Sequence, residues 1–526
     1  MDVLLARPPS RTLPFIYEDL GLETVAAALR TAGFGCRIDD LVQHPVPLGG
    51  FVERLANAPE KIIGLTLHAE PLADAHLRLF SELKRASPDK LIVVGGHPVA
   101  AIAGEISVRY PQAFDVLVHG EGDQSAVELM RHWSCGSPAL DEIPGISFRS
   151  NGRVQRTAIR SRAPWHLRPH PARDAWESPT SRPLTGSALV AFSQGCNHRC
   201  TFCSVAAYHG RGQDDWRART IDSFTRELVE LQDRYGVSDF TVVDPNFIGH
   251  PTDPEGMVRD FCRAVRSANL NATFEIATRI DSLTPSVISR LREAGVRRVF
   301  VGVESGVEAQ LRAWRKQLAP SRSLDTVHAL FEAEIYVELG MIVLQPSSTL
   351  DDIRTNLAFL RRLPYFNLYN LDQTLWPLHV GDGGFNMDER LLDPSPERIF
   401  RTYRFRDERV SRYSRFAAEL CAGLGDLFYR VRKLAWDNLS AVPGMLGRFR
   451  DAQQSLLAPY LIEIENGLSL IEAEATEQRI VDAARESVAR LRPELVRIAD
   501  RYTADVGGTP VNGGVPVVGP PGRHGH

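Results

Sequence analysis

Three of the seven cysteines, Cys196, Cys200 and Cys203, fall within eight residues of this 526-residue chain. Thiolates at such short spacing favour a soft metal or an iron–sulfur cluster. A structural zinc site, with His198 or His209 as the fourth ligand, is the alternative, but zinc sites usually pair two Cys-x-x-Cys motifs and the sequence has no second one. The spacing therefore favours a [4Fe–4S] cluster with one iron open to an external ligand. The other cysteines are scattered along the chain: Cys36, Cys135, Cys262 and Cys421.

Short apolar runs alternate with amphipathic stretches before this cluster, over residues 1–143. The runs at 3–6, 37–39, 62–66, 91–94 and 116–118 are apolar on both faces, as buried parallel strands are. Helices are expected between them, for example at 21–32 and 72–86, the first ending at Gly33. The pattern predicts a doubly wound α/β domain.

Residues 144–185 are expected to connect this domain to the next. Runs at 146–148 and 154–156 flank Asn151-Gly152, which is typical of a β-hairpin. Five prolines between 160 and 185 then disfavour helix and sheet and predict an extended linker.

A second alternating region covers residues 186–394, and the cysteines directly follow its first strand. Strands are expected at 189–192, 240–243, 273–276, 299–303, 339–343 and 368–371, with helices such as 221–235 and 285–294 between them. Six β-α units predict a (β/α)6 partial barrel, whose active-site loops follow its strands, although an open sheet gives the same pattern. Residues 395–505 are expected to be helical, and the Gly/Pro/Val-rich residues 506–526 to be disordered.

The cysteine motif resembles that of the radical S-adenosylmethionine (SAM) enzymes. It reads Cys-x₃-Cys-x₂-Cys with an aromatic residue, Phe202, before the last cysteine, on the first loop of a β/α repeat. The resemblance implies a [4Fe–4S] cluster on Cys196, Cys200 and Cys203, with SAM chelated to the open iron. It also implies an electron donor, such as flavodoxin or ferredoxin, whose electron splits SAM into methionine and a 5′-deoxyadenosyl radical.

Later segments extend the resemblance to SAM contacts. Asp244 and Asn246, after the second strand, match groups near the SAM amino end, although an Asx turn would use the same residues. Arg279 matches the basic residue near the SAM carboxylate, and Glu304 a residue facing the ribose or amino group. Val343 matches a position whose backbone lines the adenine.

The first domain resembles the cobalamin-binding domain that precedes many radical SAM cores. The similarity lies in residues 18–33, 93–98 and 118–122, where glycines at strand ends let a cofactor approach the backbone closely. The residues expected to face cobalamin are Thr66, His68, Gly95, Gly96, His97, Gly120 and Glu121.

One departure concerns the cobalt ligand. Other cobalamin domains carry Asp-x-His-x-x-Gly, but the nearest match, Asp74-Ala75-His76, has Leu79 in place of the glycine. His76 is therefore predicted to lie on a helix surface. The resemblance to radical SAM relatives implies a base-off cofactor with no histidine on cobalt.

These resemblances predict an enzyme that methylates an unactivated carbon of a small-molecule substrate. Cyclisation, ring contraction or oxidation by the same cofactors is an alternative, as is a cobalamin-free radical SAM enzyme. A cobalamin- or SAM-sensing regulatory protein is a third, but the sequence shows no basic helix-turn-helix.

Composition excludes other classes of partner. The 61 Lys+Arg and 65 Asp+Glu give a net charge of −4, which argues against nucleic acid and membrane surfaces as partners. No apolar run is long enough to span a bilayer, and the N-terminus does not resemble a signal peptide. A cytoplasmic location, where thiols stay reduced, is expected. Substrate and oligomeric state are left open.

Overall fold

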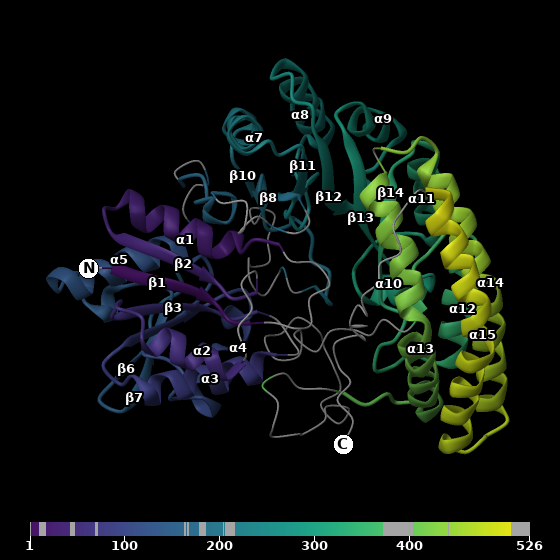
Figure 1. Ribbon diagram of the computed structural model, residues 1–526, viewed down its shortest axis with the longest axis horizontal. Helices are drawn as coiled ribbons and strands as arrows, with labels where there is room; N and C mark the ends of the chain where they lie inside the picture. The colour runs from purple at the N-terminus through teal and green to yellow at the C-terminus, as the bar shows by residue number, and fades with distance from the viewer. Residues whose placement is uncertain are drawn as a thin grey trace.

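The computed structural model divides into an N-terminal α/β region, a central α/β region and a C-terminal helical region (Figure 1). It describes residues 2–9, 17–42, 48–68, 72–162, 165, 168–177, 183, 186–203, 205, 216–371, 399, 403–439 and 441–506. His209 and the predicted tail beyond Val506 lie outside these residues.

The N-terminal sheet has seven strands, and its five parallel strands match the sequence prediction. Their order is β2 (Gly35–Asp40), β1 (Asp2–Arg7), β3 (Ile62–Thr66), β4 (Leu91–Gly95) and β5 (Val116–Val118), followed by the antiparallel β6 (Ile146–Ser150) and β7 (Arg153–Arg156). The hairpin β6–β7 thus extends this sheet. The sequence analysis placed this hairpin in the connecting residues 144–185, whereas pairing of β6 with β5 places it in the first sheet.

Helices cover both faces of this sheet. The two helices on one face are α1 (Leu20–Thr31) and α5 (Gly122–Cys135), and those on the other are α2 (Leu48–Ala56), α3 (Ala73–Ala86) and α4 (Val99–Arg109). The strand order reverses at β1, which lies between β2 and β3. In such sheets the crevice outside the carboxyl ends of the strands at this point is the usual ligand site.

The central region contains a five-stranded parallel sheet. Its order is β14 (Tyr336–Met341), β13 (Val296–Glu304), β12 (Thr273–Arg279), β11 (Asp239–Val242) and β8 (Ala188–Val190). The connecting helices are α7 (Ile221–Tyr235), α8 (Pro254–Ser267), α9 (Pro285–Glu293), α10 (Glu308–Ala313), α11 (Pro320–Glu332) and α12 (Leu350–Leu360). After β8, the short strands β9 (Ser193–Gln194) and β10 (Arg217–Ala218) pair with each other.

The predicted sixth strand is wrong: Leu368–Leu371 forms a 3-10 helix, η6. The Asn370 side chain accepts a hydrogen bond from the Asn367 backbone N–H (3.0 Å), and the Asn370 N–H donates to the Asn367 carbonyl (2.9 Å). These local bonds close a turn in an apolar run that periodicity alone cannot assign to strand or helix.

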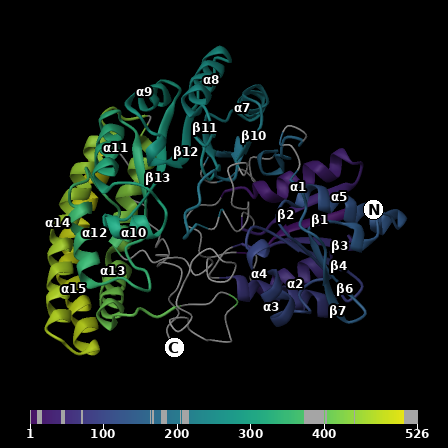
Figure 2. The same cartoon turned by 180° about the vertical axis from the view of Figure 1, so that it is seen from behind.

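Three long helices form the C-terminal region, as the sequence predicts. They are α13 (Glu408–Asn438), α14 (Met445–Glu472) and α15 (Glu477–Val506), which lie beside α12 and β14 (Figure 2). Arg432 of α13 donates to Glu338 of β14 (2.9 Å), and Trp436 packs edge-on against Tyr336. The helices thus cover the β14 side of the sheet. In the described ranges, no helix combines the length and hydrophobicity that a bilayer crossing requires.

Candidate active site and cofactor sites

The backbone that leads into the cysteine loop is held by Asp244, directly after β11. Its carboxylate accepts hydrogen bonds from the Phe192 N–H (2.8 Å), the Ser193 N–H (2.7 Å) and the Ser193 hydroxyl (2.6 Å). Burial raises the pKa of Asp244 to about 7, although these three bonds favour the carboxylate. The structure therefore gives Asp244 a role in positioning the loop, and its contact with SAM stays a prediction.

Asn246 and Arg279, which are predicted to contact SAM, lie beside the cysteines. The Asn246 Nδ2 is 3.7 Å from the Cys196 Sγ, and the Arg279 Nη1 is 3.4 Å from the Cys200 Sγ. Arg279 also donates to both carboxylate oxygens of Asp281 (3.0 and 2.6 Å) and to the Lys316 carbonyl (3.1 Å). The guanidinium is thereby fixed next to a thiol.

Lys316 lies between Glu304 and Phe202 and contacts both side chains. The Lys316 Nζ donates to the Glu304 Oε1 (2.9 Å) and lies 5.9 Å from the centre of the Phe202 ring, which packs edge-on against Trp314. Burial raises the pKa of Cys203, and the negative charge of Glu304 adds to this effect. Glu304 has a φ of +69°, an uncommon backbone conformation for a residue with a side chain. Strain of this kind concentrates at functional sites.

Val343 lies near this group. It is 1% exposed and follows β14, where the backbone N–H of Ile342 donates to the Glu304 carbonyl (2.7 Å). The Val343 carbonyl accepts from the Ser348 hydroxyl (3.4 Å). Of the predicted SAM residues, Asn246 and Arg279 thus lie next to cysteine thiols, whereas Val343 is connected to Glu304 through the backbone of Ile342.

The three cysteines are candidate ligands of a [4Fe–4S] cluster. Burial, together with the neighbouring Cys200 and Cys196, raises the pKa of Cys203 to about 12. In a [4Fe–4S] cluster each thiolate binds a different iron, and Arg279 would offset part of the negative charge.

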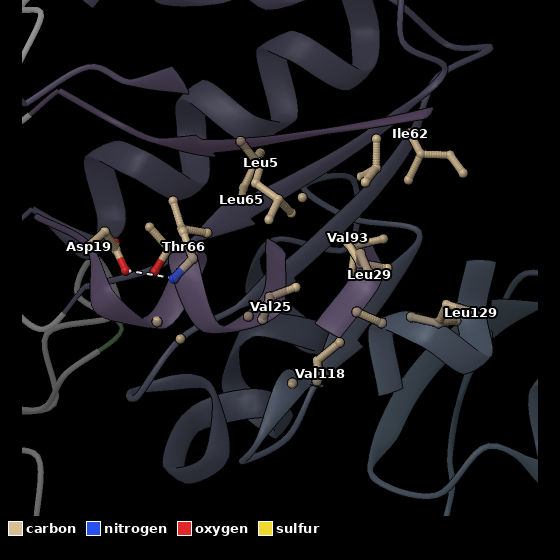
Figure 3. A pocket seen from close by; sticks show the side chains of 18 of the residues that line it. Leu5, Asp19, Val25, Leu29, Ile62, Leu65, Thr66, Val93, Val118 and Leu129 are labelled. Carbon is tan, nitrogen blue, oxygen red and sulfur yellow. Dashed lines mark hydrogen bonds between the residues drawn. The ribbon is translucent and has the colours of Figure 1, made fainter. Parts of the chain in front are cut away.

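A cavity of about 340 Å³ extends from the carboxyl ends of the strands in the N-terminal sheet along the sheet face that α1 and α5 cover. Its walls are largely aliphatic and come from β1, β3, β4, β5, α1 and α5 (Figure 3). The predicted cobalamin residues that line it are Thr66, His68, Gly95, Gly96, His97 and Gly120. The cavity suits a bulky, mostly apolar group, because its walls are mostly apolar. The small number of polar side chains at one end could orient such a group.

Gly96 explains how the chain forms one edge of this cavity. Its φ is +115°, and a Cβ there would lie 2.2 Å from the Leu67 carbonyl oxygen. The Leu67 N–H donates to the Gly95 carbonyl (2.7 Å), so the loops after β3 and β4 are in backbone contact. Only glycine fits this approach.

Glu121, which is predicted to face cobalamin, lies between Gly120 and Gly122, two glycines that line the cavity. Its carboxylate is bonded to Arg168 of the connecting segment and to Arg217 of β10, and Arg217 also donates to Gln194 (3.1 Å). Asp123 adds a second carboxylate to Arg168 (3.0 Å). Glu121 therefore joins the N-terminal domain to the strands beside the cysteine loop.

His76 is buried, which corrects its predicted place on a helix surface. It is 3% exposed, and its Nε2 lies 3.1 Å from the Pro9 carbonyl oxygen. Burial lowers its pKa to about 4, so the ring is neutral.

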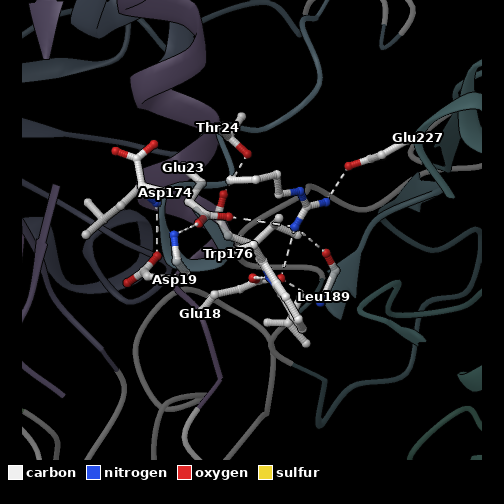
Figure 4. Close-up of polar contacts among 12 residues, drawn as sticks. Glu18, Asp19, Glu23, Thr24, Asp174, Trp176, Leu189 and Glu227 are labelled. Carbon is white, nitrogen blue, oxygen red and sulfur yellow. Dashed lines mark hydrogen bonds and ion pairs between the residues drawn. The ribbon is translucent and has the colours of Figure 1, made fainter. Parts of the chain in front are cut away.

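A buried ion-pair network connects the two α/β regions (Figure 4). Arg173 is bonded to Glu18 (2.9 Å) before α1, to Glu227 of α7 and to the carbonyl of Leu189 in β8 (2.9 Å), while Trp176 donates to Glu18. Sequence reasoning missed these residues, because it treated residues 160–185 as an extended linker. The sequence feature that could have identified them is an arginine and a tryptophan within a proline-rich stretch.

A second cavity, of about 450 Å³, lies between the regions. Gly21 and His97 line it from the N-terminal domain, and Ser193 and Gln194 line it from the strand that leads to Cys196. Gly21 and His97 also line the first cavity, so the two cavities share part of their walls.

Family comparisons agree with these two sites. Residues 190–360 match the family model of the radical SAM superfamily, and residues 7–130 match that of the B12 binding domain. The chain therefore carries a B12-binding domain in front of a radical SAM domain, the organisation of a cobalamin-dependent radical SAM enzyme. The first domain implies cobalamin, and the second implies a [4Fe–4S] cluster and SAM.

Two curated proteins illustrate the range of relatives. An anaerobic magnesium-protoporphyrin IX monomethyl ester cyclase from Synechocystis sp. is 28% identical over 352 residues, which are 64% of this chain and 67% of the cyclase. A hopanoid C-3 methylase from Methylococcus capsulatus is 24% identical over 330 residues, 62% of this chain and 61% of the methylase. The chain thus spans less than two thirds of the methylase.

Two solved structures share the fold. The cobalamin-dependent SAM radical enzyme OxsB, with aqua-cobalamin and SAM bound, matches with a TM-score of 0.69 and 17% identity over 96% of this chain and 84% of its own. The radical SAM methyltransferase TsrM from Kitasatospora setae, with cobalamin and a [4Fe–4S] cluster bound, matches with a TM-score of 0.57 and 18% identity over 70% of this chain and 71% of its own.

Proposed function

We propose that this enzyme transfers a methyl group from SAM, by way of cobalamin, to an unactivated carbon of a small-molecule substrate. The observation that carries the proposal is the cavity between the regions, because it is lined both by the B12-binding domain and by the strand that leads to Cys196. A substrate there would be within reach of both cofactors. The methylase among the relatives supports the same chemistry.

The residues beside the cysteine loop have roles in this proposal. Arg279 would pair with the SAM carboxylate, and Asn246 and Glu304 would accept hydrogen bonds from its ammonium or ribose groups. Phe202 and the backbone of Val343 would pack against the remainder of SAM. In the other domain, Thr66, Gly95, Gly96 and Gly120 would contact cobalamin.

The cellular setting completes the proposal. The cluster requires one electron per SAM cleavage, and we infer a small donor such as flavodoxin or ferredoxin. We place the enzyme in the cytoplasm, where thiols stay reduced. We also assign the hairpin β6–β7 to the B12-binding unit.

The test uses the protein with cobalamin and a reconstituted cluster, under strictly anaerobic conditions, with SAM carrying a CD₃ group and a chemical reductant. We expect S-adenosylhomocysteine and CD₃-cobalamin in equal amounts, because methylation of cobalamin precedes any transfer to substrate. The Cys200→Ala variant serves as the control and should form no 5′-deoxyadenosine. Production of 5′-deoxyadenosine with no S-adenosylhomocysteine would contradict methyl transfer.

Radical chemistry without methylation is the second candidate. The likeness to OxsB covers 96% of this chain, including the helical C-terminal region, whereas the likeness to TsrM covers 70%. One relative is a cyclase. This candidate predicts 5′-deoxyadenosine without CD₃-cobalamin in the same assay.

A further inference from the structure

Exposed arginines gather around the cysteine loop and form what we call the arginine patch. The patch consists of Arg199 within the loop, Arg312 near the end of α10, Arg315 in the turn that follows α10, and Arg322 in the first turn of α11. The protein as a whole is slightly acidic, with 61 Lys+Arg against 65 Asp+Glu. The charge of the patch is therefore opposite to the net charge of the chain.

A backbone hydrogen bond joins the turn after α10 to the cysteine loop. The Thr201 N–H donates to the Trp314 carbonyl (3.1 Å). Arg199 comes shortly before Thr201, and Arg315 directly follows Trp314. Because this bond holds the two segments together, the two exposed arginines lie close to each other and to the cysteines.

Arg279 strengthens the same junction and connects it to α11. Its Nη2 donates to the Lys316 carbonyl (3.1 Å), and its Nη1 is 3.4 Å from the Cys200 Sγ. Its guanidinium is also bonded to the Asp281 carboxylate (2.6 Å), and the carbonyl of Asp281 accepts from the Arg322 Nη2 (2.8 Å). Arg322 is thus held on the same side chain network as the thiol of Cys200.

Positive charge is in excess at this surface. The Arg312 side chain is 73% exposed and lies 3.9 Å from Glu308, a loose surface pair of the kind that contributes little to stability. Glu308 and Asp325 are the exposed carboxylates on α10 and on the first turns of α11, against four arginines. Arg315 has a φ of +56°, a conformation that residues with a side chain rarely adopt and that concentrates at functional sites.

Resting on the proposed function, in which each SAM cleavage requires one electron, we propose that the arginine patch is the docking surface for a small electron-carrier protein with acidic side chains around its own redox cofactor. Arginine pairs with carboxylates in a bidentate geometry, and complementary charges raise the association rate of short-lived complexes. Electron-transfer complexes have small interfaces, so a patch of a few residues is sufficient. The carrier loses one electron and the cluster gains it, and no bond forms or breaks.

The test measures binding and electron transfer separately, with flavodoxin as the carrier and with the protein loaded with cluster and cobalamin. Calorimetric titration with oxidised flavodoxin measures binding, and stopped-flow absorbance follows reduction of the cluster by reduced flavodoxin. We expect Arg199→Glu/Arg315→Glu to weaken binding and to slow reduction by about tenfold or more at low ionic strength. The difference from wild type should largely disappear at about 1 M salt, where the Debye length is about 3 Å.

Three controls separate docking from damage to the loop. Arg479→Glu/Arg485→Glu makes the same change in charge on α15, at the edge of the molecule, and should leave binding and reduction within about twofold of wild type (Figure 1). Reduced methyl viologen, a small cation, should reduce the cluster of the patch variant at least as fast as that of wild type. Arg312→Glu/Arg315→Glu leaves the sequence of the cysteine loop intact and should reproduce the effect if Arg199→Glu lowers the iron content.

The outcomes that overturn the inference are distinct. Equal losses in the patch and control variants, losses that do not depend on salt, or flavodoxin that does not bind the wild-type protein would each overturn it. Slow reduction of the patch variant by methyl viologen at full iron content would show that the arginines act on the cluster itself, and would also overturn it. The proposed function fails on a different measurement: absence of S-adenosylhomocysteine in the CD₃ assay, with docking intact, would contradict methyl transfer alone.

Discussion

In the B12-binding domain the candidate site is a cavity with aliphatic walls and a glycine at its edge, whereas in the radical SAM domain it is a loop of thiols among buried ion pairs. The first kind of site binds by shape, and much of it is preformed by the strands. The second kind depends on covalent ligands and on charges that hold a loop in place. The two sites should therefore fail in different ways when they are altered.

The contacts between the two α/β regions resemble the second kind of site, because they also depend on buried charges. Arg173 lies among carboxylates from both sides, with a side chain that is 7% exposed. Burial and the neighbouring Glu18 raise the pKa of Glu23 well above its usual range, and Arg173 opposes this effect. The remaining network pairs Glu18 and Glu227 with Arg173 and Arg219.

The largest effect is expected from Cys200→Ala. Loss of one cluster ligand should abolish SAM cleavage, because the cluster supplies the electron. Corrin binding should remain within about twofold of wild type, since its cavity shares no residue with the cysteine loop. Iron content and corrin absorbance of the same preparation measure both. Loss of both cofactors in this variant would contradict the view that the two sites are independent of each other.

Arg173→Met is expected to have the next largest effect. It leaves the buried carboxylates of Glu18 and Glu227 without a principal partner, which should lower the free energy of unfolding by about 3–5 kcal/mol. The control is Arg30→Met, which removes a half-exposed pair with Asp174 and should cost about 1 kcal/mol or less. Denaturant unfolding measures both variants, and equal effects would show that the buried network contributes no more than a surface pair.

Gly96→Ala tests the shape of the cobalamin cavity. The new Cβ would lie 2.2 Å from the Leu67 carbonyl at a φ of +115°, so one of the two loops must move. We expect corrin affinity to weaken about tenfold or more, which corresponds to about 1.4 kcal/mol, with iron content unchanged. Gly104→Ala in α4, where a Cβ would contact nothing within 4 Å, is the control. Unchanged corrin affinity in Gly96→Ala would mean that this edge does not shape the site.

The smallest effect concerns Glu275 of β12. Burial raises its pKa to about 7, Arg298 opposes this, and Glu338 adds to it. An acid with a raised pKa in the folded state stabilises the fold at low pH, and that contribution is lost as the pH rises from about 4.5 to about 7. Glu275→Gln should flatten this pH dependence between about pH 4.5 and 7, measured by unfolding at several pH values. An identical pH profile would contradict the assignment.

The parts of the fold that sequence predicts well are those with local causes. Alternating apolar runs gave the five parallel strands of each region, and the spacing of Cys196, Cys200 and Cys203 identified the cluster loop. The helix at Ile221–Tyr235 begins at the Thr220 cap and ends at Gly236, whose φ is +71°. Such signals need no knowledge of distant residues.

The contacts that sequence reasoning did not foresee concern side chains whose partners are distant in sequence. Asp244 was expected to face SAM, but it accepts from Phe192 and Ser193. Glu121 was expected to face cobalamin, but arginines 47 and 96 residues away bind it. A strand-end carboxylate looks the same in sequence whether it binds a cofactor or a neighbouring loop, so only the folded arrangement separates the two.

The central claim is that one chain holds a cluster on Cys196, Cys200 and Cys203 together with cobalamin in the domain before it. Metal and sulfide analysis of the anaerobically reconstituted protein tests this claim most directly. The account predicts about four irons and four sulfides per chain, with one cobalt retained as corrin after gel filtration. Bound zinc in place of iron, or an iron-containing protein that retains no cobalt, would contradict it.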